Sequence, residues 1–499
     1  MSKTIIINKN DNVAVALAPI ISGEALTLGN AALTAANDVM QGHKIAVKPI
    51  KAGEDIIKYG FPIGHATTDI LGGEHVHIHN MKTSLSGDGE YTYNPAINPP
   101  APVQPESFMG YMREDGRAAI RNELWIIPGV GCINGICERL ARESSALAEE
   151  FGLDGIHALT HPYGCSQLGD DLENTRRLLA SLANHPNAGG VLIVSLGCEN
   201  NIPDDFKEEI ISQAGDSYNS DRIKFMVCQE LEDELEHGAM LLRRLAEHAG
   251  KAKRQPVPVS KLVVAMKCGG SDGLSGITAN PLLGLLGDMI TARGGSNILT
   301  EVPEMFGAET ILLNRCVNKK VFDNSVKMIK KFKAYFTAQG QPVYENPAPG
   351  NYAGGISSLE DKSLGCVQKG GTAAVSDVID YGGQIRKKGL SLLYGPGNDL
   401  ISTANLAAAG AHIIFFSTGR GTPYSTVVPT VKVSTNTALY EKKPGWIDFD
   451  AGTIASGESL DDAAKRLYTY TLKLAGGEKT KSEENGYREI QIFKNGVIL

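Results

Sequence analysis

The sequence predicts an α/β protein that carries a small β-rich domain at its N-terminal end. Residues 1–82 alternate short β-prone runs with turn signals, and residues 84–109 are rich in Pro, Gly and Asn. The rest of the chain alternates apolar strand-like runs with helical segments. Near-continuous apolar strands between helices are typical of a buried parallel sheet, which gives the fold class.

Composition indicates an ordinary globular protein. The chain has 499 residues, of which 42% are hydrophobic and 21% charged, and its length suggests roughly three domains. A net charge of −8 opposes binding to phosphate backbones, so no nucleic acid is expected as a partner. No apolar run reaches the ~18 residues of a membrane span, and no signal peptide is recognisable. We therefore expect a cytoplasmic protein whose eight cysteines are reduced, with no membrane partner.

The N-terminal domain is predicted to cover residues 1–83. Two of its phrases are alike, AVALAPIISGEALTL and KIAVKPIKAGEDIIK, which predicts two related hairpins folded over one core. Its β-prone runs are Thr4–Ile7, Val13–Leu17, Lys44–Val47 and His75–His79. Residues 84–109 then predict an extended linker that does little packing.

The α/β part divides near the polar stretch GKAKRQPVPVSK into residues 110–255 and residues 256–499. The first portion is predicted to have strands in LWIIPGVGC, GIHALTHPYGC, GGVLIVSLGCEN and KFMVCQE, and helices over Glu138–Phe151, Asn174–Asn184 and Glu230–Ala249. The second portion is predicted to have strands in LVVAMKC, NILTEV, LSLLYG and HIIFFST.

Cysteines follow several predicted strands, where ligands bind in open α/β sheets. Cys132, Cys165, Cys198 and Cys268 each come after an apolar run and beside a glycine. A single free cysteine is often only a small buried hydrophobe, but four at equivalent positions favour at least one metal ligand or site thiol. The chain has no CxxC pair, which argues against a closed structural zinc site, and we interpret Cys137 as core packing.

Histidines are concentrated in the segment GEHVHIHN. His75, His77 and His79 recur with a period of two, so on a strand their imidazoles would share one face. Imidazole suits iron(II), manganese or zinc and also acts as a general base. The alternative is a solvated polar face of an edge strand.

Glycine-rich polar turns follow the strands of the C-terminal portion. Such turns can hold hydroxyls, carboxylates or a hard cation, and an arginine between glycines can bind a carboxylate at two points. The candidate side chains in these turns are Ser271, Asp272, Glu301, Glu304, Asp399 and Arg420. Neither a GxGxxG turn with its distal acidic residue nor a GxxxxGK[ST] loop occurs, so no nucleotide cofactor is expected.

Longer motifs resemble one known family. HPYGCSQLGDD, LGCENN, KCGGSDGLSGITANP, TEVPEMFGAE, NPAPGN, SLEDKSLGC and FSTGRGTPYS look like the altronate and galactarate dehydratases, and GEHVHIHN resembles part of their N-terminal SAF (β-clip) domain. The resemblance covers nearly the whole chain and favours the altronate branch. It implies a SAF domain, a linker, a second α/β portion that could mediate dimerisation, and a C-terminal Rossmann variant. It also implies a homodimer or higher homo-oligomer and a divalent metal, usually iron(II) and sometimes manganese.

The implied reaction converts D-altronate into 2-keto-3-deoxy-D-gluconate and water, in hexuronate breakdown. It removes the C2 proton with a general base and expels the C3 hydroxyl, while a metal stabilises the developing charge. The acid–base candidates are His75, His77, His79 and Glu304, and the N-terminal domain could bring its histidines over the C-terminal sheet and exclude water. The metal candidates are Cys165, Cys198, Cys268, Glu301 and Asp399, and the substrate-binding candidates are Arg420, Lys369, Ser271 and Asp272.

Three alternatives remain open from the sequence. One is a galactarate dehydratase. Another is an iron–sulfur hydro-lyase in which Cys132, Cys165 and Cys198 hold a cluster with one open iron. The last is a non-catalytic sugar-acid-binding protein, which would not need so many thiols and carboxylates at strand ends.

Overall fold

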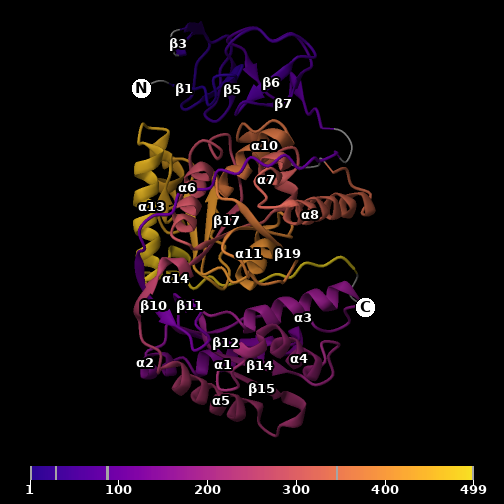
Figure 1. Cartoon of the computed structure of the whole chain (residues 1–499), viewed down its shortest axis with the longest axis vertical. Helices are drawn as coiled ribbons and strands as arrows, with labels where there is room; N and C mark the ends of the chain where they lie inside the picture. Colours follow the sequence, from indigo (N-terminus) through magenta and orange to yellow (C-terminus); the bar gives the residue numbers. More distant parts are fainter. Residues whose placement is uncertain (1–2, 29–30, 86–88, 344–346, 497–499) are drawn as a thin grey trace.

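The computed structural model describes residues 3–28, 31–85, 89–343 and 347–496, and these residues form three units in a row. The N-terminal β domain lies at one end of the long axis and the portion that begins near residue 110 lies at the other (Figure 1). The C-terminal portion lies between them, although it comes last in the sequence. The predicted fold class, an α/β protein with an N-terminal β domain and parallel sheets, is confirmed.

The N-terminal domain consists of small antiparallel sheets. Its four-stranded sheet has the order β1-β2-β5-β8, and two further sheets pair β3 with β4 and β7 with both β6 and β9. The strands are β1 (Thr4–Ile5), β2 (Val13–Ala16), β3 (Ala25–Leu28), β4 (Ala31–Thr34), β5 (Lys44–Ala46), β6 (Asp55–Lys58), β7 (Phe61–Ala66), β8 (His75–Val76) and β9 (Met81–Lys82).

The two similar phrases do not form the two hairpins that the sequence predicts. Each phrase begins in the four-stranded sheet, as β2 or β5, and ends in a strand of another sheet, as β3 or β6. The turns between them are nevertheless alike. The N–H of Gly23 donates to Ala35 and the N–H of Gly53 donates to Ala66, both at 2.8 Å, and both glycines have φ near +85°. The two segments are therefore structural repeats, but the second strand of each repeat pairs with a strand outside the repeated sequence.

The expected strand over His75–His79 is wrong beyond Val76. β8 ends there, and residues 78–80 form a turn. The side chain of Asn80 holds this turn, because its Oδ1 accepts from the N–H of His77 at 2.9 Å and its Nδ2 donates to the carbonyl of His75 at 2.9 Å. A side-chain amide thus replaces the backbone partners that a longer strand would need.

The C-terminal portion is built on a seven-stranded sheet in which every neighbouring pair is parallel. In spatial order the strands are β19 (Val375–Ile379), β20 (Gly389–Leu393), β18 (Ser296–Leu299), β17 (Val263–Cys268), β21 (Ile413–Thr418), β22 (Thr430–Ser434) and β23 (Phe449–Asp450). The chain leaves β17 for β18 on one side and later returns to β21 on the other. The carboxyl end of β17 is therefore the switch point at which open α/β sheets bind ligands.

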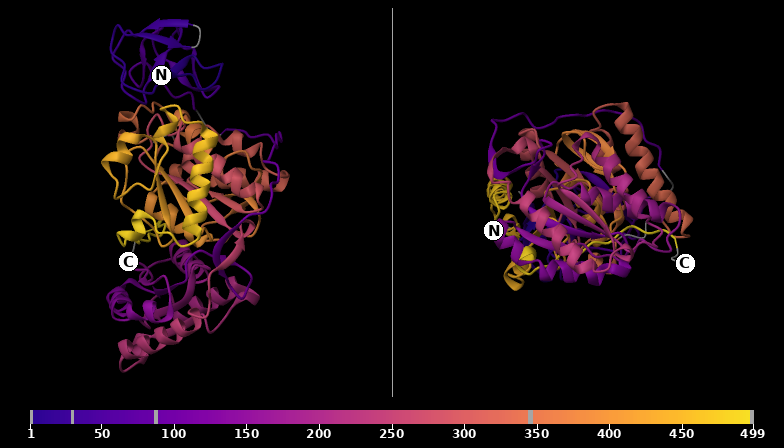
Figure 2. Two further views of the ribbon diagram at one scale, coloured as in Figure 1. Left: turned by 90° about the vertical axis from the view of Figure 1, so that its left-hand side faces the viewer. Right: turned by 90° about the horizontal axis from the view of Figure 1, so that it is seen from below.

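Helices pack around this sheet (Figures 1 and 2). The longer ones are α6 (Ala279–Ala292), α8 (Lys319–Ala338), α10 (Leu359–Cys366), α11 (Asp399–Ala408) and α13 (Leu460–Ala475). The shorter ones are α7 (Glu309–Leu313), α9 (Pro349–Ala353), α12 (Thr437–Lys442) and α14 (Lys481–Glu484).

The second α/β portion has its own parallel sheet, in the order β13-β12-β14-β15. The strands are β12 (Glu123–Pro128), β13 (Gly155–Ala158), β14 (Ala188–Ser195) and β15 (Ile223–Val227). The helices are α1 (Asn134–Glu143), α2 (Ala146–Phe151), α3 (Asp170–Ala183), α4 (Pro203–Ala214) and α5 (Glu234–Ala249). The single helix expected over Glu138–Phe151 is thus interrupted between α1 and α2, at Ser144 and Ser145.

The linker runs along the flank of the C-terminal portion (Figure 2). It is extended as expected, but the expectation of little packing is wrong. The hydroxyl of Tyr93 donates to the carbonyl of Cys316 at 3.0 Å, and the N–H of Ala96 donates to Asn314 at 2.8 Å. The ring of Tyr93 also packs against the core, so aromatic side chains anchor a segment that lacks apolar periodicity.

The linker leads into a small antiparallel sheet, in which β10 (Ser107–Met112) pairs with β11 (Ala118–Ala119) and with β16 (Gln255–Pro258). The segment that enters the second α/β portion and the segment that leaves it therefore lie side by side.

Candidate functional site

Polar side chains converge at the carboxyl edge of the seven-stranded sheet, below the N-terminal domain. Cys268 is the last residue of β17 and Glu301 follows β18. Glu304 lies in the 3₁₀ turn Val302–Met305, Cys366 ends α10, and Lys369 lies in the turn after it. All five residues are buried.

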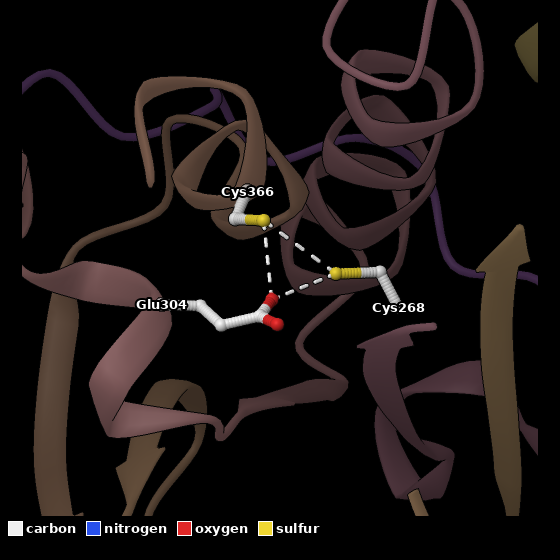
Figure 3. Close-up of side chains that lie close together, drawn as sticks. All are labelled: Cys268, Glu304 and Cys366. Carbon is white, nitrogen blue, oxygen red and sulfur yellow. Dashed lines mark hydrogen bonds between the residues drawn. The ribbon is translucent and has the colours of Figure 1, made fainter. Parts of the chain in front are cut away.

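Cys268, Glu304 and Cys366 form a compact thiol–carboxylate cluster (Figure 3). The Oε2 atom of Glu304 accepts hydrogen bonds from the two thiols, at 2.9 Å from Cys268 and 3.1 Å from Cys366, and the two sulfur atoms are 3.5 Å apart. Within the described ranges this is the one group of three His, Cys, Asp or Glu side chains whose ligand atoms all lie within 4.8 Å of one another.

Ammonium groups surround the thiol–carboxylate cluster. The Nζ atom of Lys369 lies 2.7 Å from the Sγ of Cys268 and 3.0 Å from Oε2 of Glu301. Lys362 lies 2.9 Å from Oε1 of Glu304. Burial opposes the charge on Glu304, but the attraction of Lys362 and Lys369 outweighs it and holds the pKa of that carboxyl well below its usual range. The hydrogen bond to Cys268, together with burial, raises the pKa of Cys366 far above that of a free thiol.

The charges of this region balance when the thiols are protonated. Lys267, Lys362 and Lys369 face the carboxylates of Glu301, Glu304 and Asp399, with Lys267 bonded to Glu301 and 2.9 Å from Asp399. A divalent cation would add two positive charges, which loss of both thiol protons would cancel. Two sulfurs and one carboxylate oxygen therefore fit a divalent ion, and such soft donors suit iron(II) or zinc better than manganese.

Glu301 holds a strained backbone conformation. Its φ is +69°, a left-handed conformation that non-glycine residues seldom adopt. The conformation allows its buried carboxylate to accept from the N–H of Cys268 at 3.1 Å while it also binds Lys369. Backbone strain of this kind concentrates at functional sites, where the surrounding contacts hold it in place.

A second cluster, of histidines, lies on the N-terminal domain where that domain meets the C-terminal portion. The rings of His75 and His77 have centroids 5.6 Å apart, and those of His75 and His79 5.3 Å apart, so the three imidazoles gather although their segment is not one strand. His43, which the sequence analysis missed, joins them with its Nδ1 3.0 Å from Nε2 of His75. We call these four residues the histidine cluster.

Two imidazoles of the histidine cluster, those of His75 and His77, are uncharged at neutral pH. Burial and the proximity of His43 lower the pKa of His75 to about 3, and burial and Lys44 lower the pKa of His77 to about 4. The Nδ1 of His77 lies 2.7 Å from the Oγ of Ser357, so a side chain of the C-terminal portion orients this ring. Neutral imidazoles can accept a proton or bind a first-row metal.

Buried ion pairs join the two clusters through α10. Asp361, in its first turn, lies 2.8 Å from the Nζ of Lys44 and 2.9 Å from the Nζ of Lys58, both on the N-terminal domain. Burial favours the neutral carboxyl, but the two ammonium groups outweigh it and hold the pKa of Asp361 well below its usual range. Burial lowers the pKa of Lys44 to about 8. Because Cys366 ends the same helix, α10 links the histidine contact to the thiol–carboxylate cluster.

The predicted substrate-binding residues other than Lys369 lie in the loops after β17 and β21. Arg420 is exposed, and its Nη2 donates to the carbonyl of Gly350 at 3.2 Å. Asp272 is partly buried, and its carboxylate accepts hydrogen bonds from Thr435 and Leu274, which stabilises its own loop. Ser271, beside it, accepts at its carbonyl from Asn351.

The five residues predicted as metal ligands do not come together. Cys268, Glu301 and Asp399 share the carboxyl edge of the seven-stranded sheet, with Asp399 held by Lys267. Cys165 and Cys198 follow β13 and β14, in the portion at the opposite end of the molecule from the histidines (Figure 1). Lys369, expected to bind a substrate carboxylate, instead contacts Cys268 and Glu301.

Sequence reasoning also missed Cys366 and Lys362. Both lie in SLEDKSLGC, a motif that the family resemblance used but that follows no predicted strand. Their only local signal was a cysteine and a lysine at helical spacing, which buried helices commonly contain.

Comparison with known proteins finds family matches over nearly the whole chain. The family described as "Altronate/galactarate dehydratase SAF domain" matches residues 2–84, "D-galactarate dehydratase/Altronate hydrolase, second domain" matches residues 110–250, and "D-galactarate/Altronate dehydratase, C-terminal" matches residues 259–498. The chain belongs to the altronate/galactarate dehydratase family. It is therefore a hydro-lyase, and its N-terminal β domain is a SAF domain.

Individual relatives span the chain from end to end. It is 51% identical over 505 residues to an altronate dehydratase of Bacillus subtilis (strain 168), with 100% of each chain covered. It is 48% identical to an altronate dehydratase of Escherichia coli (strain K12), with 98% of each chain covered. A galactarate dehydratase (L-threo-forming) of Escherichia coli is 30% identical, over 99% of this chain and 97% of that one.

The described helices of this family member are too short or too polar to cross a bilayer.

Proposed function

We propose that the protein dehydrates D-altronate to 2-keto-3-deoxy-D-gluconate. The observation that carries this proposal is the higher identity to the two altronate dehydratases, 51% and 48%, than to the galactarate dehydratase, 30%, at matched coverage. The polar carboxyl edge of the seven-stranded sheet supports the same reaction class, because it gathers carboxylates, thiols, lysines and imidazoles at a switch point.

We place the substrate between the histidine cluster and the loops at that edge. His43 contacts the carbonyl of Ala353 at 3.5 Å and Arg420 contacts the carbonyl of Gly350, and both partners belong to the short helix α9. A sugar acid beside α9 would therefore meet imidazoles on one side and an exposed guanidinium on the other. Arg420 would bind its carboxylate through paired hydrogen bonds.

His77 is the proposed general base. When Nδ1 carries the proton and donates to Ser357, Nε2 carries the lone pair that would accept the C2 proton. A pKa of about 4 makes a weak base in the free protein. The negative charge of a bound aldonate would stabilise the imidazolium and raise that pKa toward neutrality, where proton transfer is most effective.

Cys268, Glu304 and Cys366 are the proposed ligands of the divalent ion. When bound, such an ion supplies Lewis-acid stabilisation of the charge that develops on the substrate carboxylate. Lys362 and Lys369 keep Glu304 ionised, so its oxygens stay available as ligands. The carboxylate of Glu301 accepts from the N–H of Cys268 and so fixes the start of the loop after Cys268. The SAF domain covers this edge and would exclude water from it.

The test is an anaerobic assay of D-altronate, galactarate and related aldonates with iron(II), scored for 2-keto acid. We expect D-altronate to have the highest kcat/KM and galactarate to be poorer by a large factor. A higher kcat/KM for galactarate would move the chain to the other branch of its family. If no sugar acid is turned over although an aldonate binds tightly, the chain is a sugar-acid-binding protein and the proposed function is wrong.

A further inference from the structure

The exposed cysteines of this chain all lie in its second α/β portion. Cys137, Cys228, Cys268, Cys316 and Cys366 are buried, whereas Cys132, Cys165 and Cys198 are exposed. Free cysteine is among the most buried residue types, because it packs as a small hydrophobe and is oxidised when exposed. We call Cys132, Cys165 and Cys198 the thiol triad, and its exposure calls for a role other than packing.

The thiol triad lies at one edge of one sheet. Cys132 follows β12, Cys165 follows β13 and Cys198 follows β14, and these three strands are adjacent and parallel. Their carboxyl ends therefore meet. From β12 the chain goes first to β13 on one side and then to β14 on the other, so the triad surrounds the switch point of this sheet. That is the position at which an open parallel sheet binds a ligand.

Backbone hydrogen bonds lock the three loops together. Gly131, beside Cys132, donates its N–H to the carbonyl of Tyr163 at 2.8 Å, and Asn201 donates to the carbonyl of Gly164 at 3.0 Å. A Cβ on Gly164, which has φ +100°, would lie 2.2 Å from the carbonyl oxygen of Gly129, so only glycine allows this approach. The loops that carry the thiol triad thus form one rigid rim.

Strain and side-chain support are concentrated at the same rim. Ser166, next to Cys165, has φ +53° although it is not a glycine, and its N–H donates to Oδ1 of Asn200 at 2.7 Å. Nε2 of Gln229 donates to the Sγ of Cys198 at 3.5 Å. Hydrogen bonds to sulfur tune thiolate-bound iron, and strained residues mark places where ligands are held.

We propose that the thiol triad holds an iron–sulfur cluster with one iron left open to a small ligand. A single tetrahedral ion with sulfur ligands at ~2.3 Å would need the three sulfurs close together. Among the described residues, the thiol triad does not meet the 4.8 Å separation that Cys268, Glu304 and Cys366 do. An iron–sulfur cluster tolerates thiolates that lie further apart than the ligands of a single ion, because it binds each thiolate through a different iron. This site is separate from the proposed dehydration site and does not depend on it.

The experiment measures the cluster directly. The full chain is reconstituted anaerobically with iron(II) and sulfide, desalted, and analysed for iron, acid-labile sulfide, visible absorption and the EPR signal after dithionite reduction. We expect about four irons and four sulfides per chain. The variants Cys132→Ser, Cys165→Ser and Cys198→Ser should each lose most of the sulfide and the EPR signal.

The matched controls are Cys228→Ser, a buried cysteine of the same portion, and Cys268→Ser at the other site, and both should retain the cluster. The proposal would be overturned if the reconstituted wild-type protein contained no acid-labile sulfide, or if it bound a single metal ion through these thiols. Equal cluster content in the three triad variants and in Cys228→Ser would also overturn it.

Discussion

The Nζ atom of Lys369 lies 2.7 Å from the Sγ atom of Cys268, although the two residues are 101 positions apart in the chain. Burial opposes the charge on Lys369, but its attraction to Cys268 and Glu301 outweighs burial and raises the pKa of the ammonium. The contact pairs a fixed cation with the sulfur that would have to ionise to bind a metal. It thereby couples metal binding to the charge balance of the whole edge.

The first prediction concerns this thiol–carboxylate cluster. Cys268→Ser and Cys366→Ser each remove one soft donor, so we expect each variant to bind iron(II) at least tenfold more weakly than the wild type and to lose most activity. Cys316→Ser is the control, because Cys316 is equally buried but lies outside the cluster. Anaerobic equilibrium dialysis measures the binding, and circular dichroism checks the fold. Wild-type iron affinity in both cluster variants would contradict the ligand assignment.

The histidine cluster carries the second prediction. His77→Ala should lower kcat by about 10²–10⁴-fold, which is the usual loss for a general base, and leave the melting temperature nearly unchanged. His65→Ala is the matched control, since His65 lies in the same domain and its Nδ1 contacts Ser84 rather than the histidine cluster. If His77→Ala and His65→Ala had the same kcat, His77 would not be the general base, and the SAF domain would only cover the site.

The buried ion pairs of Asp361 carry the third prediction. Asp361→Asn leaves the ammonium groups of Lys44 and Lys58 buried without their carboxylate, so it should lower the free energy of unfolding by about 3–5 kcal/mol. Asp69→Asn breaks the exposed pair with Lys51 in the same domain and should cost no more than about 1 kcal/mol. Urea unfolding of the full chain measures both values. A loss as small for Asp361→Asn as for Asp69→Asn would show that this interface tolerates the unpaired charges.

The fourth prediction is a pH dependence. The pKa values of His75 and His77 fall from about 6.5 to about 3 and about 4, so below pH 6.5 the unfolded chain binds more protons than the folded one. Stability should therefore decrease as the pH falls from 6.5 toward 4. The groups that face these imidazoles are His43, His79 and Lys44, which oppose a positive charge, and Asp361, which favours one.

Thermal melting between pH 7 and pH 4.5 tests this dependence. The double variant His75→Gln, His77→Gln should lose less melting temperature over this range than the wild type. Parallel curves for the two proteins would contradict the assignment of the effect to these histidines.

Much of the fold could be predicted from the sequence. Runs such as LVVAMKC and IIFFST are buried on both faces of a parallel sheet, so their hydrophobicity is continuous and reveals the strands directly. The two-residue strand β8 could not be predicted in the same way. The side chain of Asn80 ends it, and the alternation of histidines beyond Val76 imitates a strand that does not form.

The sequence by itself determined the order of domains, the strands of the two parallel sheets and the residue types at their carboxyl ends. Tertiary structure alone decided which of those residues meet. Cys268 and Cys366 are 98 positions apart and contact each other only because α10 packs over the end of β17, and His43 joins His75 through the pairing of β5 with β8. Local patterns report whether a residue is buried, but the strand order and the docking of a separate domain determine its neighbours. Those depend on packing over the whole chain, which no short segment encodes.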